Sequence, residues 1–174
     1  MSFNIRTLLL LTVLVLSSTA HATDWIYLDA GASRTTIDVD GTDFKPVVPR
    51  IKLGVAIYNG ILLEYQLTGS GDDTSNNTTI EIEQISAAYL RLDTPIRSSM
   101  RMFVLLGAAE TQLNVKGAAG ATGGTDTYED FSWGVGLEDR TFSKHTLLTL
   151  EYTEYYKHDD VQISAVSLGF KLEF

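Results

Sequence analysis

A two-residue alternation of apolar and polar side chains runs through most of this chain, and it restricts the fold more than any other feature. In the segment 25–33, Ile26 and Leu28 share one face of an extended backbone, whereas Tyr27 and Asp29 share the other. Successive side chains of a β-strand point to opposite faces. The alternation therefore predicts strands that each have one apolar face and one polar face.

Eight such strands are predicted, separated by turn and loop signals. Their ranges are 25–33, 49–58, 61–68, 80–92, 98–113, 131–141, 146–156 and 161–174. Short turns are expected at 59–60, 93–95 and 142–145, longer polar links at 35–48, 69–79 and 114–130, and a short link at 157–160. The strongest turn signal is Asn59-Gly60, because both residues tolerate the positive φ of a type I′ hairpin. Short links that alternate with long ones indicate an antiparallel, up-and-down arrangement.

The polar face of these strands carries charged side chains of both signs. They are Arg50, Lys52, Glu64, Arg101, Glu138, Arg140, Glu151 and Lys171. The other face holds almost no charge. An eight-stranded barrel has an interior only wide enough for side chains, and charges withdrawn from water must be paired there. We therefore predict an all-β fold, an eight-stranded antiparallel transmembrane barrel whose apolar face meets lipid and whose lumen holds this charge network. A soluble secreted β-sandwich is the alternative fold.

In two segments the residue pattern does not show which side chains face the lumen. Residues 89–92 are bulky on both sides of the strand. The apolar stretch 102–109 is similarly ambiguous, and there we place Arg101, Phe103, Leu105 and Gly107 inside the barrel.

The first twenty-two residues have the features of a removable signal peptide. Arg6 provides a short positive region, residues 8–16 form an apolar run, and Ala20-His21-Ala22 fits a small-residue cleavage site. The run is shorter than the about 20 residues that a membrane helix needs. The expected domains are a signal peptide at 1–22 and a barrel domain at 23–174.

Composition excludes several classes of function. Without Arg6, 12 basic residues remain against 22 acidic residues, which leaves a formal charge of −10. Phosphate binding to nucleic acid needs a clustered basic surface, so no nucleic-acid partner is expected. The chain has no cysteine, which excludes thiolate chemistry, a disulfide framework and lipoprotein attachment.

The last nine residues, Val166 to Phe174 (VSLGFKLEF), alternate strictly and end on an aromatic side chain. This ending resembles the C-terminal signature of bacterial outer-membrane proteins. The segments 131–138 and 148–152 are similar to strands of small opacity-type and OmpA/OmpX-type eight-stranded barrels of the porin family. The resemblance implies a bacterial cell outer-membrane protein that is monomeric and contacts outer-membrane lipid and lipopolysaccharide. It also implies that the barrel-assembly machinery reads the C-terminal strand through Phe170, Leu172 and Phe174.

The function that fits these features best is an integral outer-membrane barrel with a structural or surface-interaction role, a side-chain-filled lumen and no enzymatic activity. A narrow channel or small-solute porin is one alternative, and a lipid A-modifying enzyme is another. A hydrolase needs a serine activated by a histidine and an orienting acid. After signal removal only His145 and His158 remain, both in predicted links. Acidic loop residues could bind Ca²⁺ or Mg²⁺, but they follow no metal-loop spacing, so neither a metal nor a cofactor is expected.

Overall fold

The computed structural model describes residues 26–39, 41–75, 78–94, 99–116, 122–143, 145–158 and 161–174. In these residues the chain forms ten strands. They are β1 (Ile26–Val39), β2 (Thr42–Phe44), β3 (Val47–Tyr58), β4 (Ile61–Thr68), β5 (Gly71–Ser75), β6 (Thr78–Asp93), β7 (Met100–Lys116), β8 (Thr122–Ser143), β9 (Thr146–His158) and β10 (Val161–Glu173). Across the described ranges, no helix is long and apolar enough to cross a membrane. The expected signal peptide lies outside the described residues and stays a prediction.

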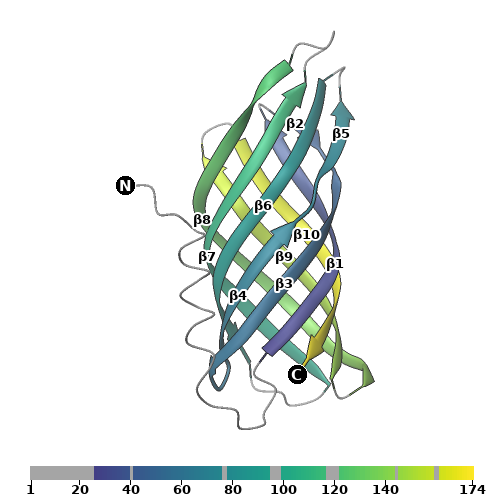
Figure 1. Ribbon diagram of the computed structural model, residues 1–174, viewed down its shortest axis with the longest axis vertical. Coiled ribbons are helices and arrows are strands. Elements are labelled where there is room, and N and C mark those ends of the chain that lie inside the picture. Colours follow the sequence, from purple (N-terminus) through teal and green to yellow (C-terminus); the bar gives the residue numbers. More distant parts are fainter. Residues whose placement is uncertain are drawn as a thin grey trace.

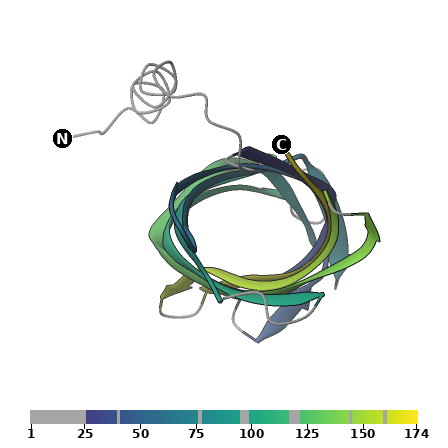
Figure 2. The same cartoon turned by 90° about the horizontal axis from the view of Figure 1, so that it is seen from below.

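Eight of these strands close into an antiparallel barrel (Figures 1 and 2). β1, β3, β4, β6, β7, β8, β9 and β10 pair in that order, and β10 returns to pair with β1. The closing seam ends where the Phe174 amide donates to the Ile26 carbonyl over 2.9 Å. The predicted eight-stranded barrel is thus confirmed, and both ends of the described chain lie at one end of it.

The two ends of the barrel differ. The end that carries the termini, called here the turn end, has the short connections between β3 and β4 and between β8 and β9. The first is the predicted Asn59-Gly60 turn, in which Gly60 has a φ of 77°. A side chain is strained at that backbone angle, so the glycine is required there. At the opposite, loop end, β2 pairs with β1 and β5 pairs with β6.

The structure corrects the three long links that the sequence predicts. Instead of a link at 35–48, β1 continues to Val39, β2 folds back against it, and β3 begins at Val47. The tract 69–79 contains β5 and the start of β6, and the tract 114–130 contains the end of β7 and the start of β8. Most of the polar sequence assigned to loops therefore extends the barrel wall at the loop end.

These polar segments are strands because the apolar face changes from the outside of the barrel to the inside toward the loop end. On β6, Leu90 points outward and Arg91 is buried in the lumen, as a membrane barrel requires. Nearer the loop end of the same strand, Ile82 is buried inside and Gln84 is exposed. A bulge between Ile82 and Gln84 shifts the register at this point. The loop end is therefore built like a water-soluble sheet, with its apolar side chains inside.

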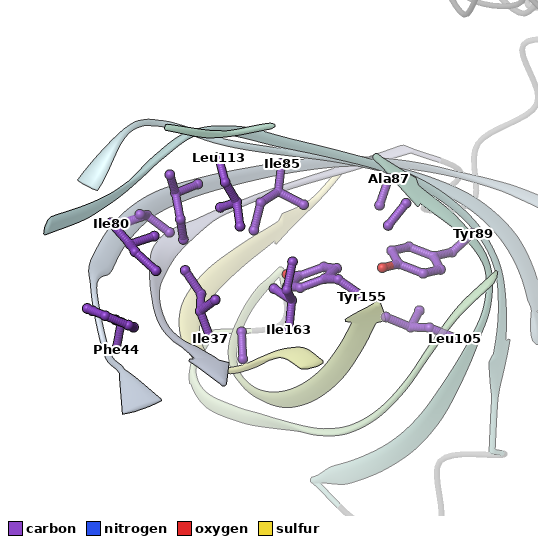
Figure 3. Close-up of a cluster of buried hydrophobic side chains, with 14 of the residues drawn as sticks. Ile37, Phe44, Ile80, Ile85, Ala87, Tyr89, Leu105, Leu113, Tyr155 and Ile163 are labelled. Atoms are coloured by element: carbon purple, nitrogen blue, oxygen red, sulfur yellow. The ribbon is translucent and has the colours of Figure 1, made fainter. Parts of the chain in front are cut away.

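These inward apolar side chains form one cluster that fills the loop end and extends to Phe103, beside Arg91 (Figure 3). It consists of Ile37, Phe44, Val48, Ile80, Ile82, Ile85, Ala87, Tyr89, Phe103, Leu105, Ala109, Leu113, Tyr155, Ile163 and Ala165. Burial of apolar surface away from water stabilises this part of the protein without help from lipid. The lumen is therefore filled by apolar side chains at this end.

At the loop end the wall divides into two sheets. Pairing of β8 with β9 ends at Trp133 and Glu154, and the rest of β8 pairs with β7 alone in the described part of the chain. Between β2 and β5 the described residues show no ladder. The sheets β5–β6–β7–β8 and β9–β10–β1–β2 thus enclose the apolar cluster as the layers of a β-sandwich do. Side chains bridge the gaps: the Ser132 hydroxyl donates to the Glu154 carbonyl over 2.6 Å, and the Lys45 amide donates to the Asp73 carboxylate over 2.6 Å.

Candidate functional site

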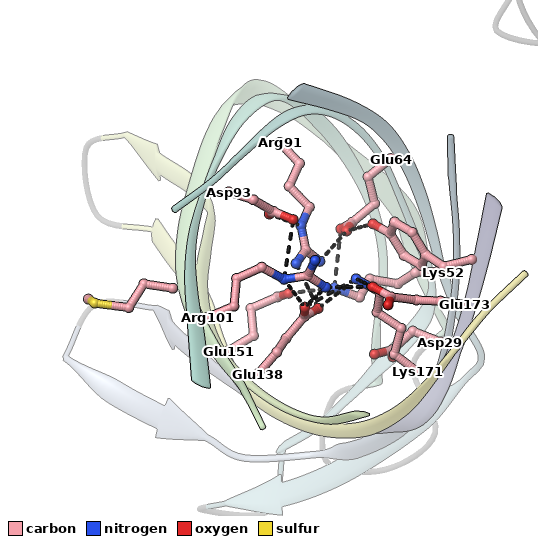
Figure 4. A network of polar contacts seen from close by, with 12 residues as sticks. Asp29, Lys52, Glu64, Arg91, Asp93, Arg101, Glu138, Glu151, Lys171 and Glu173 are labelled. Atoms are coloured by element: carbon pink, nitrogen blue, oxygen red, sulfur yellow. Dashed lines mark hydrogen bonds and ion pairs between the residues drawn. The ribbon is translucent and has the colours of Figure 1, made fainter. Parts of the chain in front are cut away.

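A network of charged side chains fills the turn-end half of the lumen (Figure 4). Its acidic members are Asp29, Glu64, Asp93, Glu138, Glu151 and Glu173, and its basic members are Arg50, Lys52, Arg91, Arg101, Arg140 and Lys171. The six acidic and six basic groups come from all eight barrel strands and balance in formal charge. This balance is what a closed interior requires, because an unpaired charge there loses its hydration without compensation.

Glu151 on β9 organises the first part of the network. It accepts from Arg50 Nη1 at 2.9 Å and from Lys52 Nζ at 2.5 Å, both from β3. Arg50 also reaches Asp29 on β1 at 3.1 Å. Lys52 lies 3.2 Å from Glu64 on β4. Since all of these side chains are buried, the contacts tie β1, β3, β4 and β9 together across the lumen.

Glu138 on β8 organises the second part. Arg91 Nη2 lies 2.7 Å from its carboxylate and Lys171 Nζ lies 3.1 Å away, and Arg101 donates two hydrogen bonds to it. Arg91 also lies 3.4 Å from Glu64, which joins this part to the first. One carboxylate thus compensates three cations, from β6, β7 and β10.

At the turn-end mouth, Glu173 on β10 accepts from Arg101 at 2.6 Å and lies 3.1 Å from Lys171. Arg140 of β8 lies 3.3 Å from the same carboxylate and is partly exposed. The network therefore begins at the rim of the barrel and continues inward without interruption.

Aromatic rings and glycines shape the space around these charges. The Tyr27 hydroxyl donates to Glu64, and the Arg91 guanidinium lies 3.8 Å from the centroid of the Phe103 ring. A Cβ at Gly54 would lie 2.0 Å from the Tyr27 ring, and one at Gly136 would lie 2.2 Å from the Phe103 ring. The two glycines thus leave the room that the two rings occupy.

The eight charged residues that the sequence analysis assigned to the lumen lie inside the barrel or at its rim. Arg50, Lys52, Glu64, Glu138, Glu151 and Lys171 are buried in it, Arg101 is partly buried, and Arg140 lies at the rim. The predicted inward facing of Phe103 and Leu105 is confirmed.

Four network members were missed by the sequence analysis. Asp29 and Glu173 lie on the polar faces of the first and last predicted strands, so the alternation itself could have indicated them. Arg91 lies in the segment 89–92 that showed no preferred face, and Asp93 was assigned to a turn. Arg91 is buried beside the Phe103 ring, which occupies space that Gly136 of β8 leaves free.

Two buried serine hydroxyls are engaged with other hydroxyl groups. The buried Ser33 hydroxyl pairs with that of Ser167 at 2.7 Å, and the buried Ser132 hydroxyl with that of Tyr89 at 2.8 Å. His145 and His158 are both exposed. Among the side chains described, no group of three or more histidine, aspartate or glutamate residues is placed to hold a metal ion.

The proposed assembly residues lie on the outer face of β10. Phe170, Leu172 and Phe174 alternate with the lumen-facing Lys171 and Glu173, and all three are exposed to the membrane side. They are part of a belt of exposed apolar side chains around the barrel, which also includes Leu28, Leu53, Leu90, Val135 and Leu168.

Comparison with known proteins identifies the family to which the chain belongs. Residues 7–174 match the model of the outer membrane protein beta-barrel domain, so the chain belongs to that family. It is an integral protein of the bacterial outer membrane. In such barrels the short turns face the periplasm and the longer connections face the cell exterior. The turn end is therefore periplasmic and the loop end extracellular.

Solved structures share the fold. Neisserial surface protein A is 17% identical with a TM-score of 0.71, over 89% of this chain and all of that one. Ail, the attachment invasion locus protein of Yersinia pestis, is 16% identical with a TM-score of 0.66, over 87% of this chain and all of that one. The N-terminal β-barrel domain of Pseudomonas aeruginosa OprF is 13% identical with a TM-score of 0.61, over 88% of this chain and 100% of that one. No curated protein matches the sequence.

Proposed function

We propose that this protein has a structural or surface-interaction role in the outer membrane, has no enzymatic activity and does not conduct ions or solutes. The observation that carries the proposal is the filling of the lumen over its whole length. Balanced ion pairs occupy the periplasmic half, and an apolar cluster occupies the extracellular half.

Each half opposes conduction for a different reason. In the periplasmic half, an ion could pass only by displacing buried carboxylates and cations from their partners, which costs several kcal/mol for each group left unpaired. In the extracellular half, side chains such as Ile37, Ile82 and Leu113 are fully buried and offer no polar group to replace an ion's hydration. Eight-stranded barrels are in general only wide enough for their own side chains.

The refolded protein is therefore expected to show no steady conductance in a planar bilayer, over both polarities and at high salt. Heat-modifiable migration of the same protein preparation in detergent gels verifies that the barrel is closed. Unitary current steps that scale with salt concentration and with the amount of closed barrel would overturn the closed lumen and favour the channel alternative.

The charge of the outer surface near the loop end limits the kind of partner that this protein can bind. One structure of Ail holds the heparin analogue sucrose octasulfate, a polyanion. In this chain the outward side of β6, β7 and β8 toward the loop end carries Glu81, Glu83, Glu110 and Glu129. Such a surface repels polyanions, so the ligand of Ail is not carried over to this protein.

We also propose that Phe170, Leu172 and Phe174 are read by the barrel-assembly machinery. Phe174 is 67% exposed, and its described backbone contacts join it to Ile26. Its ring is thus available to another protein before the barrel enters the membrane, and its loss removes little of the folded structure.

Replacing Phe174 by Ala is expected to reduce several-fold the amount of heat-modifiable barrel that cells assemble, while the purified variant refolds in detergent as the wild type does. Phe131→Ala is the matched control, because Phe131 is 63% exposed on the same outer surface but lies outside the C-terminal strand. Equal assembly of both variants in cells would contradict the proposal, as would failure of purified Phe174→Ala to refold.

A further inference from the structure

Three rings and one carboxylate lie together at the extracellular end of the barrel, where β8 and β9 no longer form a ladder. In the described residues the pairing of these two strands ends at Trp133 and Glu154. Beyond that pair, side chains from both strands meet across the gap between the two extracellular sheets. They are Tyr128 and Asp130 of β8 and Tyr156 and His158 of β9, called here the mouth cluster.

The two tyrosine rings cover the outer end of the apolar cluster. Tyr128 is the register partner of Thr111 on β7, and Tyr156 is that of Ile163 on β10. Both partners are buried, so the tyrosines face the interior. They pack against the apolar cluster and are only partly buried. The rings therefore contact apolar side chains on one side and are accessible to water on the other.

The three rings of the mouth cluster stand at steep angles to one another. The centroids of Tyr128 and Tyr156 are 5.1 Å apart with an interplanar angle of 70°, and those of Tyr156 and His158 are 5.6 Å apart with an angle of 59°. Rings at such angles do not cover each other's faces as a parallel stack would. Burial, with the charge of Asp126 and the neighbouring Tyr156, raises the pKa of the Tyr128 phenol. The electron-rich faces of neutral rings attract cations.

Asp130 adds a full negative charge beside the rings. Its Oδ1 accepts from the Phe131 amide over 2.7 Å, and its Oδ2 accepts from the Lys157 amide over 3.4 Å. His158 Nε2 lies 3.6 Å from Oδ2 and is charged only when protonated. The Lys157 ammonium lies 4.0 Å from Glu154 instead. In these contacts the backbone uses the hydrogen-bonding capacity of Asp130, whereas its charge has no permanent cation beside it.

Acidic side chains outnumber basic ones on the strands around the mouth cluster. The adjoining segments are 124–132 of β8, 154–158 of β9, 109–116 of β7, 161–164 of β10 and 36–39 of β1. They carry six carboxylates, Asp38, Glu110, Asp126, Glu129, Asp130 and Glu154, and two ammonium groups, Lys116 and Lys157, besides the imidazole of His158. The field of these charges favours cations over anions.

We propose that the mouth cluster binds a quaternary ammonium group, the trimethylated nitrogen found in compounds such as choline. Such a cation has no N–H group to donate, so it suits a carboxylate whose oxygens already accept hydrogen bonds. Its methyl groups contact the ring faces, which is how aromatic cages recognise quaternary ammonium ligands. A primary ammonium group is strongly hydrated, and Asp130 has little accepting capacity left to replace that water. The ligand rests on the surface-interaction role proposed above but not on the closed lumen, so binding and conductance can fail separately.

The test is a titration of the refolded protein with choline in octyl glucoside micelles, which contain no choline, at pH 8, where histidine is ordinarily uncharged. The amide resonances of Phe131 and Lys157, whose N–H groups contact Asp130, report binding. Saturable shifts are expected for the parent. Tyr128→Leu should weaken binding roughly two- to fivefold, the loss expected for one exposed cation–π contact, whereas Tyr128→Phe keeps the ring and should bind as the parent does.

A second pair of variants tests the charge. Asp130→Asn should weaken choline binding roughly fivefold or more, because the attraction between the two charges is lost. Glu129→Gln is the matched control: it removes the neighbouring acid of the same strand, which is exposed on the outer face, and should change affinity less than about twofold, since water screens that charge. Heat-modifiable migration verifies that each variant is folded. Absence of saturable shifts in the parent, or equal affinity of the parent, Tyr128→Leu and Asp130→Asn, would overturn the proposal.

Three further ligands define the group that is recognised. The uncharged isostere 3,3-dimethyl-1-butanol should give no saturable shift, and ethanolamine, with a primary ammonium group, should bind at least several-fold more weakly than choline. Equal binding of either compound would overturn the quaternary ammonium as the ligand. Phosphocholine distinguishes a free ammonium compound from a lipid head group. It should bind more weakly than choline because the surrounding carboxylates repel its phosphate, and binding as tight as that of choline would overturn the free compound as the source.

Discussion

Replacing Glu138 by Gln is expected to lower the free energy of unfolding of the barrel by about 3–5 kcal/mol, the usual cost of removing one partner of a buried ion pair. Glutamine keeps the shape of the side chain but removes the charge that compensates Arg91, Arg101 and Lys171. The three cations would then repel one another in a lumen where water cannot hydrate them. Urea unfolding in lipid vesicles, followed by tryptophan emission, measures the effect.

Two further variants locate the cause of this loss. Glu129→Gln removes an acidic side chain of the same strand that is exposed, and it should change stability by less than about 0.5 kcal/mol, as surface substitutions usually do. Adding Lys171→Met to Glu138→Gln should restore part of the stability, because one uncompensated cation is then absent. A loss below about 1 kcal/mol for Glu138→Gln, or a double variant no more stable than the single one, would show that the network contributes no specific stabilisation.

The membrane-embedded part of this fold could be predicted from the sequence because one physical rule governs it. Lipid outside and a narrow interior favour strands in which apolar and polar side chains alternate, as they do around Arg50 and Lys52 on β3. The same rule placed Glu64, Glu138 and Glu151 on the inner face. For these charged residues, membership of a common lumen therefore follows from the alternation.

The partners within the lumen could not be predicted, because they depend on the closure of the whole barrel. Lys52 meets Glu151 across 99 positions of sequence, and only the strand order and register bring them together. The aromatic rings are equally context-dependent. Phe103 and Tyr27 fit inside only because Gly136 and Gly54 lie beside them on other strands. The sequence of one strand does not indicate which residues face it across the barrel.

The extracellular strands were mistaken for loops for a different reason. Above the membrane the outer face meets water, so side chains such as Thr125, Thr127 and Glu129 on β8 are polar where Val135 is apolar. Strand β5 (Gly71–Ser75) lies at the edge of its sheet and has no apolar side chain of its own. A search for one constant apolar face fails at the point where that face changes from lipid to water.

This inversion of polarity predicts opposite results for one substitution made at two positions of β6. Leu90→Lys places a charge on the lipid-facing side of the membrane barrel, which costs about 2–4 kcal/mol near the middle of the bilayer. It should lower the stability of the whole barrel in vesicles. Ile82→Lys buries an ammonium group in the apolar extracellular cluster, where no described acid of that cluster compensates it. The extracellular sheets should therefore separate while the membrane barrel persists.

Limited proteolysis of intact cells, combined with heat-modifiable migration, separates the two effects. Ile82→Lys should be cleaved from outside at least tenfold faster than the wild type, and the fraction that remains should still migrate as a closed barrel. Leu90→Lys should lose closed barrel at a lower temperature without this early external cleavage. Gln84→Lys, which lies between the two and is exposed to water, should do neither. If Ile82→Lys resists external protease as the wild type does, the apolar cluster is not what holds the extracellular sheets together. If Leu90→Lys leaves barrel stability unchanged, the outer face of β6 does not meet lipid at that depth.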